Sequence, residues 1–322
     1  MIKKNIADVI GSLSAVVLPA KEWDDLFTFV SDFTLSEELP RKELAMMLLS
    51  VMIEHFTEED VQMYYQNMHP IIESYLKSNV PSLKRLAVLT VNNLTMTDNS
   101  ADVLMKYPNL VPLVLEAIDL EDGDLVSTIF DTLIDFFDKP KVLKPHLNLL
   151  IQTACQITLN IDLPFHVRLS TALFMERLAE VFTKKLAKKK RELIDLMIAT
   201  GFKIASGEKD HSNEDGNDLH ELYLPMLFVF ASDLPNKIVY PVYKQNIIEF
   251  CKSKTDPYLR KAGLKIMGFV VEPDALYTPM KDDMEEYTDL ILAGMNDEND
   301  VVRITACDTA GEFSEQHPDF LE

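Results

Sequence analysis

Apolar residues recur along most of the chain with the 3.6-residue period of an amphipathic helix. Near the C-terminus, for example, Val302, Ala306, Ala310 and Phe313 fall on one helical face. Most of the prolines stand between the periodic segments, where they start or stop helices. The pattern predicts one lone helix followed by seven helix pairs. Their ranges are 2–18, then 22–33 with 39–56, 60–77 with 81–96, 101–119 with 123–138, 140–159 with 164–183, 186–205 with 218–232, 237–252 with 256–271, and 281–295 with 299–316.

The second helix of several pairs opens on a common motif, in which an apolar residue precedes an arginine and a small residue follows it. Arg260 and Arg303 are 43 positions apart, and Arg85 and Arg168 are 83 apart, or about two such steps. A helix-pair unit that recurs every 40–47 residues or so is typical of HEAT and armadillo proteins. The sequence therefore predicts an all-α fold, a right-handed α-solenoid of about seven and a half HEAT helix pairs. We expect one continuous segment over residues 1–322, in which the four arginines form a structural ladder between repeats.

Composition supports helices and narrows the class of partner. The chain has only 9 glycines, and its net charge is −21. That charge argues against direct binding of nucleic acid or of an anionic membrane, and it favours a basic protein or peptide. An acidic surface that serves solubility alone would have the same composition. The three cysteines lack the spacing of a disulfide framework or a zinc site, so we expect no metal and no cofactor.

Motifs of catalysis and of membrane insertion are missing from the sequence. It contains no phosphate-binding loop, no G-x-S-x-G and no H-E-x-x-H, and its histidines are scattered. The longest apolar stretch, 223–231, is too short to cross a bilayer. We therefore expect a binding protein and not an enzyme.

Two blocks near the C-terminus resemble the mid-chain repeats of the importin-β (karyopherin-β) family, closest to its importin-four type. They are Asp256–Gly263, and Val301–Ala306 continuing to Gly311–Ser314. Trp23 resembles a tryptophan of the family's outer helices, and the 44–51 helix matches in kind. The resemblance implies a nuclear import receptor that shuttles between cytoplasm and nucleus. Its implied partners are basic cargo proteins of ribosomal or histone type, phenylalanine-glycine nucleoporins, and the Ran GTPase, whose GTP form would release the cargo.

The two ends of the sequence and one loop add to this interpretation. The chain begins in mid-repeat and neither end resembles a polar capping repeat, so we expect a fragment of a longer solenoid. A long acidic loop at 206–217 splits one helix pair, and the family carries an acidic loop in a mid-chain repeat that contacts Ran or basic cargo. By that resemblance the contacting residues would be Glu208, Asp210, Glu214, Asp215 and Asp218. A solvated loop without a partner remains the alternative.

Acidic residues also recur at matching positions of the second helices. Counted from the repeat arginine, they fall at or beside offsets of 5, 9 and 12, which lie on one helical face. These candidate cargo-binding residues are Asp131, Asp135, Asp138, Glu176, Glu180, Asp308 and Glu312. Second helices usually line the concave face of a solenoid, so the stripe predicts an acidic concave face for a Lys/Arg-rich signal. If the stripe is only a solvated charged face, the alternative is a generic HEAT scaffold for complex assembly, like the structural subunit of a protein phosphatase.

One basic run interrupts this acidic chain, from Lys184 to Arg191. We interpret it as the polar face at the start of a helix, balancing nearby acid. A nuclear localisation signal or a nucleic-acid patch is the alternative.

Overall fold

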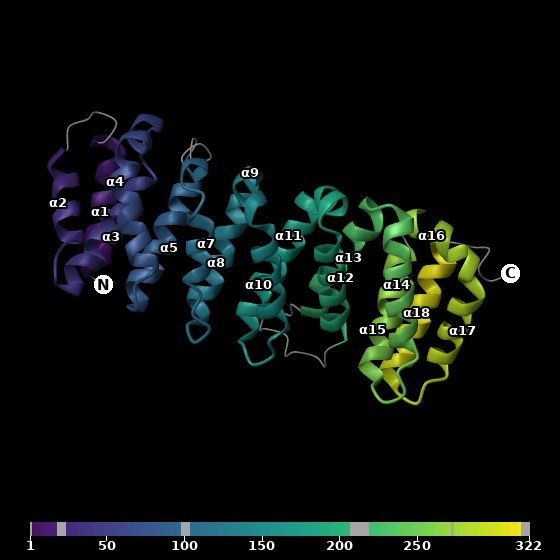
Figure 1. Cartoon of the computed structure of the whole chain (residues 1–322). Coiled ribbons are helices and arrows are strands. Elements are labelled where there is room, and N and C mark those ends of the chain that lie inside the picture. Colours follow the sequence, from purple (N-terminus) through teal and green to yellow (C-terminus); the bar gives the residue numbers. More distant parts are fainter. Residues whose placement is uncertain (1, 18–23, 98–103, 207–218, 272–273, 317–322) are drawn as a thin grey trace. The chain divides into compact units, whose positions relative to one another are not determined.

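The computed structural model describes residues 2–17, 24–97, 104–206, 219–271 and 274–316 (Figure 1). Within these ranges the ordered elements are all helices, so the predicted all-α class is confirmed. The chain divides into two compact units, residues 1–150 and 151–322. A single continuous segment stays a prediction.

The first unit begins with the predicted lone helix and the first two predicted helix pairs, and continues with shorter helices. Its helices are α1 (Ile2–Val17), α2 (Asp24–Thr34), α3 (Leu39–Ile53), α4 (Glu58–Leu76), α5 (Pro81–Thr95), α7 (Leu110–Glu116), α8 (Gly123–Asp135), the 3-10 turn η1 (Phe136–Asp138), α9 (Pro140–Leu143) and η2 (Lys144–His146). Helix α10 (Leu147–Leu159) runs across the boundary at residue 150.

The second unit continues the alternation. Its helices are α11 (Phe165–Lys189), α12 (Arg191–Ala205), α13 (Leu219–Asp233), α14 (Asn236–Cys251), α15 (Pro257–Val271), α16 (Asp274–Met280), η3 (Lys281–Asp283), α17 (Met284–Met295) and α18 (Asp300–Gln316).

In each unit the second helices of the pairs pack on one another in chain order. In the first unit α1 packs on α3, α3 on α5 and α5 on α8; in the second, α11 packs on α13, α13 on α15 and α15 on α18 (Figure 1). The first helices lie beside this row, as α4 does against α5 and α14 against α15. The small residues after the repeat arginines are buried in the row, which lets neighbouring helices approach closely. They are Ala87, Ala172, Ala262 and Ala306.

Several helix starts agree with the proline signals, whereas three predictions of helix boundaries are wrong and α16, which contains Pro279, was not predicted. Pro81 and Pro257 each stand at the first position of a helix, where the missing N–H is not needed. The predicted helix 101–119 is broken at Pro108 and resumes as α7, and the predicted helix 140–159 is interrupted by η2, which contains Pro145.

The third error concerns the end of α11. The prediction closed this helix at residue 183 and started the next at 186, but α11 continues to Lys189 and α12 begins at Arg191. Leu186 is buried, and the lysines around it are good helix formers, so nothing stops the helix before Lys190. The basic run therefore lies mainly at the end of a helix and not at a start.

Two of the four ladder arginines reach an aspartate in the next helix pair. Arg85 donates from Nε to Asp122 Oδ2 at 2.9 Å. Arg260 donates from Nε and Nη2 to Oδ2 and Oδ1 of Asp297, at 2.6 and 2.8 Å. Each aspartate also accepts a backbone N–H near the start of that second helix: Asp122 accepts from Leu125 in the first turn of α8, and Asp297 accepts from Asn299 just before α18. These arginines therefore link the start of one second helix to the start of the next.

The other two arginines bond inside their own pair. Arg168 is buried and donates from Nε to the carbonyl of Thr158 at 3.0 Å, and Arg303 donates from Nη1 to the carbonyl of Asp297 at 2.7 Å. Arg168 therefore ties α11 to the last turn of α10, and Arg303 ties α18 to the loop that precedes it.

Candidate functional site

A hollow of about 390 Å³ in the first unit lies between α5 and α8 and contains two of the predicted acidic residues. Helix α5 contributes an apolar side chain and an amide, and α8 contributes apolar, hydroxyl and carboxylate side chains. Its lining residues are Leu89, Asn92, Thr128, Asp131, Thr132, Ile134 and Asp135. The hollow thus presents both an apolar wall and anionic groups to a ligand.

Negative charge is crowded at this hollow. Asp131, Asp135 and Asp138 follow one another at helical spacing on α8 and η1. Burial, and then repulsion from Asp131 and Asp138, raises the pKa of Asp135, while Lys139 works in the opposite direction. The Lys139 ammonium donates to the backbone carbonyls of Thr95 and Thr97. A cation from outside would relieve the repulsion among the three carboxylates.

In the second unit Glu176 and Glu180 share one face of α11 but differ in their surroundings. Burial, and then repulsion from Glu180, raises the pKa of Glu176. Glu180 accepts a hydrogen bond from Arg177 Nη1 at 2.6 Å. Part of the charge predicted for this stretch is therefore neutralised by its own helix, and Glu176 is the stronger candidate of the two.

The last two candidates, Asp308 and Glu312, are exposed on α18. The Glu312 carboxylate lies over Gly268 of α15, where any larger residue would collide with Oε2. Glu312 therefore belongs to a surface shared by α15 and α18.

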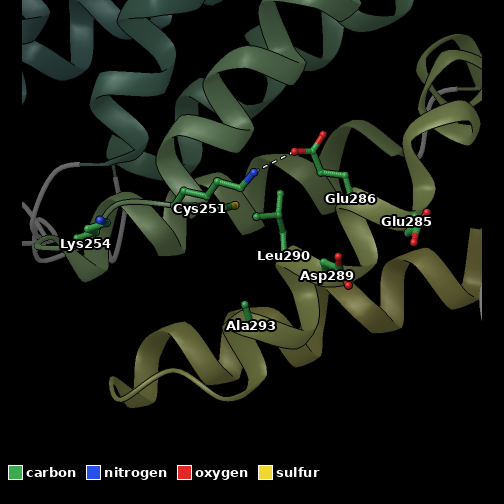
Figure 2. Close-up of a pocket in the computed structure, with 8 residues that line it drawn as sticks. Cys251, Lys254, Glu285, Glu286, Asp289, Leu290 and Ala293 are labelled. Atoms are coloured by element: carbon green, nitrogen blue, oxygen red, sulfur yellow. Dashed lines mark hydrogen bonds and ion pairs between the residues drawn. The ribbon is translucent and has the colours of Figure 1, made fainter.

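A second groove, of about 760 Å³, lies in the second unit between α17 and the end of α14 with the loop that follows it (Figure 2). One side carries lysines and the other carboxylates, with apolar groups between them. The lining residues are Cys251, Lys252, Lys254, Glu285, Glu286, Asp289, Leu290 and Ala293. Lys252 Nζ and Glu286 Oε1 form an ion pair at 3.0 Å across the groove (Figure 2).

Sequence reasoning did not find this second groove. Cys251 and Leu290 have helical core spacing, and that spacing does not distinguish a groove floor from a core. The alternation of acidic residues with Leu290 and Ala293 along α17 is the only signal that could have suggested it.

Some predicted features lie outside the described residues, namely the acidic-loop residues Glu208, Asp210, Glu214, Asp215 and Asp218, and also Trp23. In the part of the chain that is described, His, Cys, Asp and Glu side chains nowhere gather in threes as metal ligands. Among the described helices, none has the length and hydropathy needed to span a bilayer.

Comparisons with known proteins found a similar family model and a similar curated protein. A family model described as "IPO5-like, TPR repeats" matches residues 1–153. Importin-4 of Mus musculus is 20% identical over 326 residues, which cover 91% of this chain and 28% of importin-4.

Solved structures of Kap121p have the same fold. Kap121p bound to RanGTP matches with a TM-score of 0.74 at 16% identity, over 93% of this chain and 30% of Kap121p. Kap121p bound to Nup53p matches with a TM-score of 0.73 at 15% identity, over 91% of this chain and 29% of Kap121p. The comparisons confirm the predicted α-solenoid fold and the resemblance to the importin-β family. The chain spans less than a third of the length of these relatives.

Proposed function

We propose that this chain is part of a nuclear transport receptor, not an enzyme, and that the acidic face of its second helices captures basic cargo. The hollow between α5 and α8 is the observation that carries this proposal, because it joins Asp131 and Asp135 to an apolar wall. A cargo lysine would lay its aliphatic stem against Leu89 and Ile134 and bring its ammonium to the two carboxylates. The raised pKa of Asp135 supports the proposal, since a cation there relieves repulsion that already exists.

The remaining acidic positions would add further weak contacts. Glu176, Asp308 and Glu312 would each bind one cationic side chain of an extended signal. An exposed ion pair contributes about 0–1 kcal/mol, so affinity would come from several pairs together. Cargo with clustered lysines, such as ribosomal or histone proteins, fits this requirement.

The matched structures suggest further partners. Kap121p has been solved bound to RanGTP and to Nup53p. By that likeness we propose that Ran-GTP releases cargo, that the acidic loop at 206–217 contacts Ran or cargo, and that the receptor shuttles between cytoplasm and nucleus. The groove between α14 and α17 is our candidate site for a phenylalanine-glycine nucleoporin, because Leu290 and Ala293 offer apolar surface between first helices (Figure 2).

The cargo proposal can be tested with a fluorescent lysine-rich histone-tail peptide titrated with the chain across a salt series. We expect micromolar or tighter binding that weakens steeply with salt. The double variant Asp131→Asn with Asp135→Asn should weaken binding about tenfold. A matched control, Asp25→Asn with Asp32→Asn on α2, removes the same charge from exposed positions and should change affinity less than twofold.

Two outcomes would contradict the proposal. Equal losses in the two double variants would mean that net charge alone attracts the peptide. No binding at low salt would mean that the acidic face is only solvated, and the scaffold alternative would then be favoured.

A further inference from the structure

Cationic side chains cluster at the junction between α11 and α12, although the chain as a whole has a net charge of −21. The last two turns of α11 carry Lys184, Lys185, Lys188 and Lys189, all exposed. Arg191 follows as the first residue of α12 and is also exposed. Cations in the last turn of a helix complement the helix dipole, which explains Lys188 and Lys189 but not the lysines one turn earlier.

A third helix adds to the same surface. Arg191 Nη2 donates to the carbonyl of Ile238 at 3.3 Å, which holds the first turn of α14 against the junction. That turn carries Lys237, whose side chain is exposed. We refer to Lys184, Lys185, Lys188, Lys189, Arg191 and Lys237 as the basic junction.

Carboxylates of the protein neutralise only part of the basic junction. Lys184 pairs with Asp233 at 3.3 Å, and Arg191 approaches Asp195 at 3.9 Å. Lys185 instead lies over the ring of Phe182, 5.3 Å from its centroid. Lys188 and Lys189 have no ion-pair partner among the residues that the structure describes. The surface therefore keeps an excess of positive charge at its centre.

We propose that the basic junction docks an extended acidic segment of a partner protein. Lysines at i and i+4 on a helix are about 6 Å apart, as Lys184 is from Lys188 and Lys185 from Lys189. In an extended segment, alternate residues are about 6.8 Å apart, so carboxylates at every second position match this spacing. The surface is distinct from the acidic hollow and takes a ligand of opposite charge.

Physical reasons favour an acidic peptide over nucleic acid. A long polyanion would extend beyond the junction into the field of a strongly acidic protein, which repels it. A short segment experiences mainly the local lysines, because charges more than about 8 Å away are screened at physiological salt.

The test is fluorescence anisotropy with the full chain and a labelled 12-residue peptide of alternating Glu and Ser. A single-stranded oligonucleotide of equal length serves as the second probe. We expect the peptide to bind more tightly than the oligonucleotide at physiological salt. The triple variant Lys185→Gln, Lys188→Gln and Lys189→Gln should weaken peptide binding about tenfold, because three ion pairs of about twofold each are lost.

A matched triple variant removes the same charge from exposed lysines spread over the described surface: Lys106→Gln, Lys203→Gln and Lys281→Gln. It should leave peptide binding within twofold. Circular dichroism melts of both variants check that the helices remain folded. Equal weakening by the two triple variants, tighter binding of the oligonucleotide, or no peptide binding at low salt would each overturn the proposal.

Discussion

Asp297→Asn should destabilise the second unit more than Asp122→Asn destabilises the first. Both aspartates accept hydrogen bonds from an arginine 37 residues earlier, Arg260 and Arg85 respectively. The two aspartates are similarly buried, with 10% of Asp297 and 13% of Asp122 exposed, but the side chain of Arg260 is 12% exposed whereas that of Arg85 is 45% exposed. The same arginine–aspartate interaction is therefore present at two sites that differ in how far the arginine is exposed.

The magnitudes follow from that difference in exposure. Removing one partner of a fully buried ion pair destabilises a protein by about 3–5 kcal/mol, whereas an exposed pair contributes about 0–1 kcal/mol. For Asp297, whose arginine partner is also nearly buried, we expect a loss of about 2 kcal/mol, and for Asp122, whose arginine partner is exposed, about 1 kcal/mol or less. Asparagine keeps the side-chain oxygen that accepts the N–H of Asn299 or of Leu125, so the substitution removes mainly the charge.

Urea unfolding of the full chain, followed by circular dichroism, measures both losses. The hydrogen bonds from Arg260 hold the pKa of Asp297 below its ordinary value of 3.8. A depressed carboxyl pKa stabilises the fold above the ordinary value, and this stabilisation is lost as pH falls through that value to the folded-state pKa. The difference in the free energy of unfolding between wild type and Asp297→Asn should therefore become smaller in acid. Equal losses at the two sites, or a difference that stays constant with pH, would refute the reasoning.

Two further predictions concern packing and pH. A methyl group on Gly263 would lie 2.7 Å from Cys251 Sγ and 2.9 Å from its backbone nitrogen, so Gly263→Ala should destabilise the chain by about 2 kcal/mol in urea titrations. Gly311→Ala, whose methyl would meet nothing within 4 Å, should be neutral or stabilising by up to about 1 kcal/mol, and a loss there would contradict the packing argument. Burial lowers the pKa of His69 below 6.5, so stability should fall as pH drops from that value toward the folded-state pKa. His69→Gln should flatten this part of the dependence of the melting temperature on pH, and an unchanged slope would exclude His69 as its source.

The repeat could be predicted from the sequence because each pair carries its own local signals. Pro81 and Pro257 start second helices, and an alanine follows each repeat arginine two to four positions later. The end of α11 was harder to predict, because the lysines at 184, 185, 188 and 189 are good helix formers but carry no signal that marks a boundary. The burial of Leu186 also favours a continued helix, and burial depends on neighbouring elements that the local sequence does not specify.

The positions of the candidate site residues could be predicted from the sequence, but not how strongly each carboxylate would attract a cation. Helical spacing placed Glu176 and Glu180 on one face of α11. It could not show that Arg177 already pairs with Glu180, or that Glu176 is partly buried with a raised pKa. That difference depends on side-chain conformation and on the packing of α11 against its neighbours. A carboxylate that already has a partner gains little from a cargo cation, whereas a crowded and desolvated one such as Asp135 gains more. The acidic stripe therefore acts, under our proposal, through a few poorly satisfied carboxylates and not through its total charge.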